Sequence, residues 1–232
     1  MNFNPTEFGL RKDHLYEIIA TSYSIIRGGT AIKPNASCMG IRLVENNMIQ
    51  IKPFYTTSTY QNLKENSIIT LNFVDDVYLY ALAALKHPNS QIGLEEFPLE
   101  YYEFQHLKSL YMDIPYIKNS WGILTCKVSK IFQEIKRDDF GEIMVPVFRL
   151  EVISSELFKR SYKLFNRAES LALEIIILAT RLNIAKSNKN EQLVSKICDR
   201  IRVHFNDVRR FGKNERALMT LELVTKYISN LM

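Results

Sequence analysis

A series of short β-rich runs, separated by turn signals, occupies the first two thirds of the chain and most constrains its fold. Runs rich in Ile, Val, Tyr and Thr, some alternating with polar residues, are typical of strands. Six runs of similar size stand at residues 15–26, 36–44, 48–55, 67–74, 121–135 and 142–153. Gly28-Gly29, Asn46-Asn47 and residues 138–141 provide the turns. Turns join antiparallel neighbours, whereas parallel strands need a crossover, so we expect a six-stranded antiparallel barrel.

The segment at residues 75–118 departs from this β pattern. Asp75 or Asp76 is placed to cap a short helix that runs through Lys86. An aromatic stretch punctuated by prolines follows, up to Lys118. We interpret residues 75–118 as a helical and loop insertion that covers the barrel.

After Ile153 the hydrophobic period becomes helical. Asn166 with Glu169 three positions later forms a capping-box pattern, and an apolar stripe follows it. A loop at residues 187–190 precedes a second helix that ends near Gly212, and Asn214 is expected to cap a third. The predicted fold class is α+β, mainly β: a split-barrel domain at residues 1–153 and a C-terminal subdomain of three helices at residues 154–232.

Composition and cysteine usage set the broad class. The chain has 232 residues, 47% hydrophobic and 24% charged, enough for one large core or a core domain with an appendage. No apolar run approaches the roughly 18 residues that span a bilayer, and the start of the sequence shows no secretory signal. Cys38, Cys126 and Cys198 form no C-x-x-C pair. We therefore expect a cytoplasmic protein that does not span a membrane.

The net charge of +5 is a modest bias toward phosphorylated ligands and acidic surfaces. Much of the positive charge lies near the C-terminus, at Lys196, Arg200, Arg202, Arg209, Arg210, Lys213 and Arg216. A footprint for RNA or DNA is one interpretation of this cluster. A solvated helix face is favoured, because no aromatic interleaving or recognition motif accompanies the charges.

Signatures of self-sufficient catalysis are absent. The four histidines show no metal-ligand spacing, so no metal site is expected. The sequence also lacks a G-x-S-x-G elbow, a P-loop and a G-x-G-x-x-G motif. The catalytic residues are therefore unknown, and an enzyme of this kind would take its chemistry from a cofactor.

A hydroxyl-rich run at residues 55–63, Tyr-Thr-Thr-Ser-Thr-Tyr-Gln-Asn-Leu, follows the third strand-like segment. It is placed to open a short helix, whose free N–H groups and dipole favour an anion such as phosphate. The same pattern also fits a strand end with an ordinary threonine cap, because Ser and Thr are common N-caps.

Three segments in order resemble a known superfamily: residues 34–42 (Pro-Asn-Ala-Ser-Cys-Met-Gly-Ile-Arg), 51–63 and 70–73. Together with residues 7–10 and 165–168, their order and spacing resemble the FMN-binding split-barrel proteins, and more narrowly the largely archaeal family called domain of unknown function 447. The resemblance implies a homodimeric barrel that holds each FMN at the boundary between protomers.

The resemblance also implies roles for particular residues. The strand segment would run beside the isoalloxazine ring, with Met39 against its apolar face; a core methionine on a strand is the alternative explanation of Met39. Gly40 would let the backbone approach the ring. The hydroxyl-rich run would hold the ribityl chain and the phosphate. The implied cofactor-binding residues are Asn35, Ala36, Ser37, Cys38, Met39, Gly40, Arg42, Thr56, Thr57, Ser58, Thr59, Asn62, Asn72, Asn166 and Arg167.

The functional hypothesis that follows is an FMN-binding protein that acts as a flavin-dependent oxidoreductase of unknown substrate. A non-catalytic flavin carrier or sensor, whose helical appendage binds a partner, is the alternative. A nucleic-acid-binding module that uses the basic C-terminal helices is a third hypothesis.

Overall fold

The computed structural model divides the chain into two units, each with dense internal contacts. Met1–Val74 and Leu99–Ser161 form the barrel unit, and Asp75–Pro98 and Tyr162–Met232 form the helical unit. The residues that the structure describes are 3–26, 31–89, 91–107, 111–138, 141–159, 166–211 and 214–231. The expected turns at Gly28-Gly29 and at residues 139–140, Phe165 and the helix end near Gly212 lie outside the described residues.

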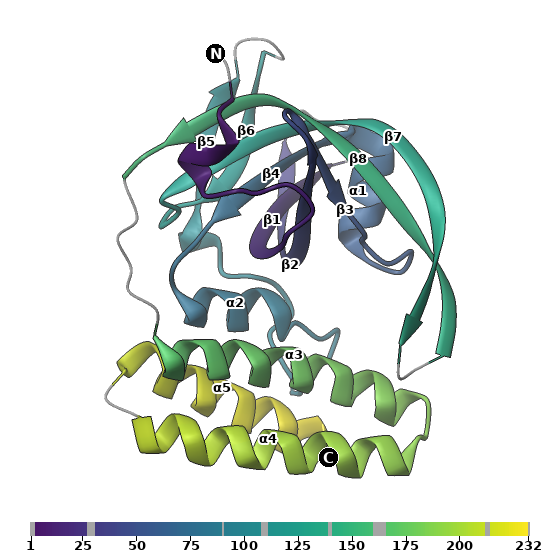
Figure 1. The fold of residues 1–232 in the computed structure, drawn as a ribbon, viewed down its shortest axis with the longest axis vertical. Helices are drawn as coiled ribbons and strands as arrows, with labels where there is room; N and C mark the ends of the chain where they lie inside the picture. The colour runs from purple at the N-terminus through teal and green to yellow at the C-terminus, as the bar shows by residue number, and fades with distance from the viewer. Residues whose placement is uncertain are drawn as a thin grey trace. The chain divides into compact units, whose positions relative to one another are not determined.

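The barrel unit contains the six predicted strands as one closed antiparallel barrel, which confirms the expected fold class (Figure 1). The barrel order is β1-β2-β3-β8-β7-β4, and it closes because β1 also pairs with β4. Its strands are β1 (Leu15–Ile25), β2 (Ile32–Glu45), β3 (Met48–Ile51), β4 (Ile68–Phe73), β7 (Gly122–Asp138) and β8 (Gly141–Leu157).

Alternate residues of each strand fill the barrel interior. Ile18 on β1, Ile41 on β2 and Leu71 on β4 belong to one buried cluster, together with Ile49 on β3 and Phe148 on β8. Each of these five side chains is at most 1% exposed. Because side chains alternate between the two faces of a strand, this core fixes which residues of β2 face inward and which face outward.

A two-stranded sheet that the sequence did not predict also lies in the barrel unit. β5 (Tyr102–Leu107) pairs with β6 (Met112–Ile117), after a short 3-10 helix at Leu99–Tyr101. Ile114 and Leu107 pack with Tyr23 of β1 and Ile68 of β4 in a second small core. This hairpin lies within the insertion predicted at residues 75–118, where the sequence suggested helix and loop. Pro115 is tolerated in it because a proline can stand in an edge strand.

The hairpin of β7 and β8 pairs along its whole length, from Gly122 opposite Leu157 to Asp138 opposite Gly141. Figure 1 shows these two strands as a long curved ribbon that extends past the shorter strands of the barrel. The register of this hairpin shifts twice, and the second shift lies between Val128 and Lys130.

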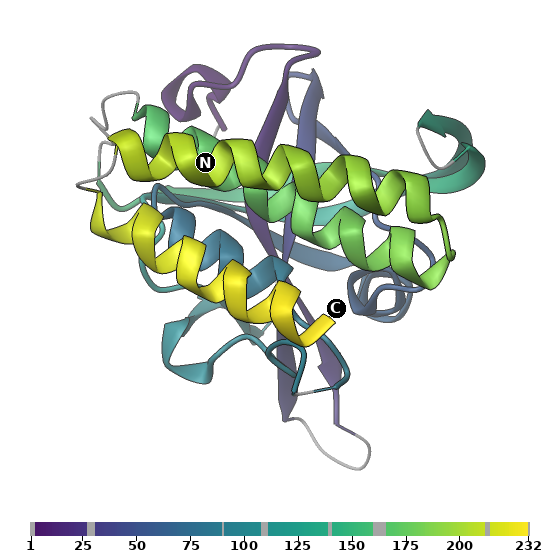
Figure 2. The ribbon, with the colours of Figure 1, turned by 90° about the horizontal axis from the view of Figure 1, so that it is seen from below.

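The helical unit consists of α2 (Val77–Ala84), α3 (Arg167–Ser187), α4 (Glu191–Phe211) and α5 (Glu215–Leu231). Figure 2 shows the three long C-terminal helices as neighbouring rods. α2 packs against α3 and α5 through an almost wholly apolar surface. Asp75–Pro98 therefore belongs to the helical unit, which differs from the expected division that placed residues 75–118 within the barrel domain.

The expected helix starts are observed in atomic detail. The side chain of Asp76 accepts the N–H of Tyr78, and that of Asn166 accepts the N–H of Glu169. Asn214 likewise accepts the N–H of Ala217, at 2.9 Å. None of the helices in the described part of the chain is long and apolar enough to cross a membrane.

Several cations of the C-terminal basic cluster have acidic or aromatic neighbours. Arg202 lies 3.3 Å from Asp199, and Arg210 lies 3.2 Å from Asp207. Arg216 pairs with Asp76 at 2.7 Å and so ties α5 to the start of α2. These pairs agree with a solvated helix face, and the absence of nucleic-acid binding stays a prediction.

Candidate functional site

The hydroxyl-rich run opens a helix, as the sequence predicted. Helix α1 covers Ser58–Asn66, and Thr57 is its N-cap. The Thr57 hydroxyl accepts the N–H of Tyr60 at 3.2 Å and donates to the carbonyl of Phe54 at 2.7 Å. The Thr57 hydroxyl thus caps the helix, and the ligand contact that the family resemblance implied for it stays a prediction.

The first turn of α1 keeps donors for a ligand. The backbone N–H groups of Ser58 and Thr59 have no acceptor within the described part of the chain. The side chains of Thr56 and Ser58 are exposed beside them. Two free N–H groups at the positive end of a helix, flanked by two hydroxyls, can bind a phosphate group.

A buried polar cluster joins this helix to strand β2. The hydroxyl of Thr59 forms a hydrogen bond of 2.8 Å with that of Ser37 and accepts one of 3.3 Å from the amide of Asn35. Thr59 is 1% exposed. The two segments that the sequence singled out therefore meet in the structure through side-chain hydrogen bonds between residues 22 and 24 positions apart in the chain.

Ser22 of β1 completes this cluster and was missed from the sequence. Its hydroxyl accepts from the amide of Asn62 at 3.0 Å and from that of Asn35 at 3.4 Å, and Ser22 is fully buried. Only the β1–β2 register, which sets Ser22 opposite Asn35, brings it there. We call Ser22, Asn35, Ser37, Thr59 and Asn62 the polar cluster.

The polar cluster contains no titratable side chain. Its serine, threonine and asparagine groups donate and accept hydrogen bonds but cannot exchange a proton near neutral pH. No group of His, Cys, Asp and Glu that could hold a metal occurs among the described residues. The site can therefore bind and orient a polar ligand, while redox chemistry would have to come from the ligand itself.

The alternation of β2 changes the expected role of Met39. Asn35 and Ser37 point to the side of the strand that carries Met39, and Met39 lies in the barrel core at 8% exposure. Its side chain therefore packs in the interior, and the expected contact with a flavin ring stays a prediction. The core methionine that the sequence left open as an explanation is what the structure shows.

The opposite face of β2 carries Ala36, Cys38 and Gly40. Ala36 is fully buried, so its side chain is not available to a ligand, whereas Cys38 and Gly40 are partly exposed. A Cβ atom on Gly40 would lie 3.0 Å from Cδ1 of Leu15, which is 56% exposed. The open surface beside this part of the strand is therefore formed around Cys38, Gly40 and Leu15.

Asn72 has a structural role, and its expected support of a ligand stays a prediction. Its amide donates to the carbonyl of Ile19 at 2.8 Å and to the Thr21 hydroxyl at 3.2 Å. Its side-chain oxygen accepts the N–H of Ile117 at 2.8 Å. Because Asn72 is 0% exposed and its polar atoms are used, it ties β6 to β4 and β1 rather than facing a ligand.

Arg42 lies too far along β2 to support the polar cluster. It is five residues beyond Ser37, or about 16 Å along an extended strand. Its guanidinium donates to the carbonyl of Asp13 at 2.9 Å. Arg42 therefore stabilises the segment before β1, and its expected support of the phosphate stays a prediction.

Asn166 and Arg167 belong to the helical unit. Asn166 caps α3, as the sequence predicted, and Arg167 stacks over the ring of Phe211 at 4.9 Å from its centroid. These contacts explain both residues without a ligand. Their expected contact with a cofactor stays a prediction.

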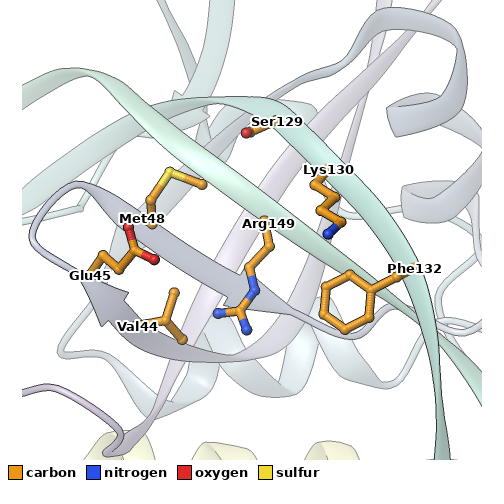
Figure 3. A pocket seen from close by; sticks show the side chains of 7 residues that line it. All are labelled: Val44, Glu45, Met48, Ser129, Lys130, Phe132 and Arg149. Carbon is orange, nitrogen blue, oxygen red and sulfur yellow. The ribbon is translucent and has the colours of Figure 1, made fainter.

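A surface pocket of about 330 Å³ lies at the other end of β2, and the sequence did not predict it. Figure 3 shows its lining: Val44, Glu45, Met48, Ser129, Lys130, Phe132 and Arg149. Arg149 and Lys130 both approach Phe132 in this view. Its residues come from four strands and are scattered along the chain, so no local sequence pattern predicts the pocket.

Comparison with known proteins places the chain in a family. Residues 16–158 match the model described as "Protein of unknown function (DUF447) N-terminal domain". The chain belongs to this family. The match covers nearly all of the barrel strands and the whole polar cluster, but neither Asn166 nor Arg167.

Three individual proteins illustrate what this chain is similar to. An uncharacterized protein of Methanocaldococcus jannaschii is 25% identical over 188 residues, which is 79% of this chain and 85% of the relative. The crystal structure of an FMN-bound DUF447 protein of Methanosarcina mazei has the same fold, with a TM-score of 0.71 at 17% identity over 97% of this chain and 100% of that chain. A flavoredoxin of Methanosarcina acetivorans is less similar, with a TM-score of 0.46 at 15% identity over 63% of this chain and 75% of that chain.

Proposed function

We propose that this protein binds FMN in its barrel unit and uses it for electron or hydride transfer to a substrate that is still to be identified. One observation carries the proposal: the polar cluster joins the inner side of β2 to the start of α1, where two N–H groups are free. Membership of the DUF447 family and the shared fold with an FMN-bound member support it.

The residues present fit an FMN molecule in the following way. The phosphate lies at the start of α1, where the N–H groups of Ser58 and Thr59 and the hydroxyls of Thr56 and Ser58 donate to it. The ribityl hydroxyls exchange hydrogen bonds with Asn35 and Ser37, the partly exposed members of the polar cluster. The ring lies beside the backbone of residues 38–40.

When bound, FMN supplies the redox chemistry that the chain lacks. The protein's own side chains bind, orient and shield the flavin. The polar cluster offers neutral donors and acceptors whose positions are fixed by hydrogen bonds to one another, and these hold the ligand in one position. A second protomer would cover the exposed side of the ring, so we propose a homodimer with the flavin at the boundary. Sedimentation of the 27.1 kDa chain with and without FMN tests the dimer directly.

A flavin carrier or sensor without catalysis is the second candidate. It is favoured by the absence of any titratable side chain from the polar cluster, which leaves no general acid or base among these five residues. Reduction by NADH, NADPH or a reduced deazaflavin separates the two functions. Flavin that none of these donors reduces, while it stays bound, supports the carrier.

Binding itself is tested by titration of the flavin-free protein with FMN and with riboflavin, followed by quenching of flavin fluorescence. We expect FMN to bind more tightly, because only FMN has the phosphate. The double variant Thr56→Val, Ser58→Ala should weaken FMN binding about tenfold or more and leave riboflavin binding nearly unchanged, since hydrogen bonds to a charged group contribute about 1.5–3 kcal/mol each.

Ser195→Ala is the matched control, because Ser195 is an exposed serine on α4 in the helical unit. Its affinity for FMN should equal that of the parent protein. A colourless protein that does not quench FMN fluorescence at any concentration tested would end the proposal.

A further inference from the structure

The pocket of Figure 3 is built around two breaks in strand register. Leu43 pairs with Ile49 and Glu45 with Met48, so Val44 is the extra residue on β2. In the β7–β8 hairpin, Ser129 is the extra residue between Val128 and Lys130. Val44 and Ser129 both line the pocket. Bulges of this kind re-aim side chains and are frequent beside functional sites.

Two cations stand directly opposite each other in this pocket. Lys130 pairs with Arg149 in the β7–β8 register, and like charges in that position are destabilising. Both lie over the ring of Phe132, Arg149 at 5.6 Å and Lys130 at 5.9 Å from its centroid. Neither forms an ion pair with a residue in the described part of the chain, although Glu45 is also in the lining.

We propose that this pocket binds a small organic anion, in which a carboxylate or a phosphate ester is attached to an apolar body. Arg149 lies over the ring of Phe132, and its guanidinium can make bidentate contact with an anion. Lys130 adds a second positive charge, and the Ser129 hydroxyl is a further donor. Met48 and Val44 provide an apolar surface for the body of the ligand.

The anion site is separate from the proposed FMN site of the same chain. Val44 is seven residues beyond Ser37 on β2, which is about 23 Å along an extended strand. The pocket volume of about 330 Å³ is at the small end of the range for ligand sites, so it suits a ligand of one or two rings.

Calorimetry on the purified protein with its bound flavin, without free FMN and at low ionic strength, tests the proposal with three probes: phenyl phosphate, benzoate and benzyl alcohol. At least one anion should bind with Kd of about 1 mM or below, as expected for about ten heavy atoms, and the neutral alcohol should not. Binding of phenyl phosphate alone identifies phosphate esters as the class, and binding of benzoate alone identifies carboxylates. Equal binding of the alcohol, or no binding of either anion, overturns the proposal.

Variants of the two cations locate the site. Lys130→Gln and Arg149→Gln should each weaken anion binding about tenfold. Lys127→Gln is the matched control, because Lys127 is an exposed lysine on the same strand that stands opposite Glu151 and outside the pocket. A loss of affinity in the control equal to that in Lys130→Gln would show nonspecific charge attraction and would refute the site.

Stability provides a readout that does not depend on binding. Without an anion, Lys130→Gln removes one of two like charges, so its Tm should rise by about 1–3 °C. A protein that merely uses Lys130 to support its fold would lose stability on the same change. A fall in Tm together with unchanged anion affinity therefore contradicts the proposal.

Discussion

Asn72 offers a sharp test of how the barrel is held together. In Asn72→Ala, the buried N–H of Ile117 loses its acceptor, and the carbonyl of Ile19 and the hydroxyl of Thr21 lose a donor. An unsatisfied buried group costs about 1–3 kcal/mol, and a lost hydrogen bond about 1 kcal/mol. We therefore expect the free energy of unfolding to fall by about 3 kcal/mol.

The measurement is urea unfolding of the FMN-free protein, followed by the fluorescence of Trp121. This residue is the single tryptophan of the chain, and its ring lies 5.1 Å from that of Phe73 in the barrel unit. The FMN affinity of the folded variant should stay within about twofold of the parent value, because Asn72 has no atom facing the proposed site. If Asn72→Ala does not fold, Asn72→Ser keeps a smaller polar group at this position.

Asn62→Ala is the comparison variant, because the Asn62 amide makes a single hydrogen bond, to Ser22 within the polar cluster. We expect it to cost about 1 kcal/mol of stability but to weaken FMN binding about tenfold. The reasoning is refuted if Asn72→Ala keeps its stability and loses FMN affinity, since Asn72 would then contact the ligand and not the hairpin.

Three further outcomes are expected. The hydroxyls of Thr70 and Thr125, opposite each other on β4 and β7, are buried with no hydrogen-bond partner among the described residues. Thr125→Val should therefore raise the free energy of unfolding by about 1 kcal/mol, and an unchanged or lower Tm would contradict this. Burial and a hydrogen bond to Glu103 raise the pKa of Tyr116 from 10.0 to about 12, so the stability that this neutral phenol contributes is complete below pH 10 and is lost between pH 10 and 12. The stability gap between the parent and Tyr116→Phe should close over that window, as measured by urea unfolding at each pH, and a constant gap would be inconsistent with the shift. FMN should slow alkylation of the partly exposed Cys38 but not of Cys198 on α4, as measured by mass spectrometry. Cys126, whose pKa is raised by complete burial, should stay unmodified. Equal protection of Cys38 and Cys198 would show that the ring does not lie beside β2.

Local signals were sufficient for much of the fold. Strand alternation located the six barrel strands, and short polar residues located helix starts within residues 55–63, at Asp75 or Asp76, at Asn166 and at Asn214. These features depend on residues a few positions apart, so the sequence displays them directly. The β5–β6 hairpin was missed because Pro115 interrupts its strand pattern, and a proline is readable as an edge-strand residue only when the partner strand is known.

The sequence by itself determined which segments could bind a nucleotide: a strand with Asn35 and Ser37, and a hydroxyl-rich helix start. Only the tertiary structure decided which of their atoms are available. A sequence does not show which face of a strand turns toward the core. The structure was therefore needed to show that Met39 is interior and that Asn72 has a structural role. Register, which depends on partners far away in the chain, placed Ser22 in the polar cluster and set Lys130 against Arg149.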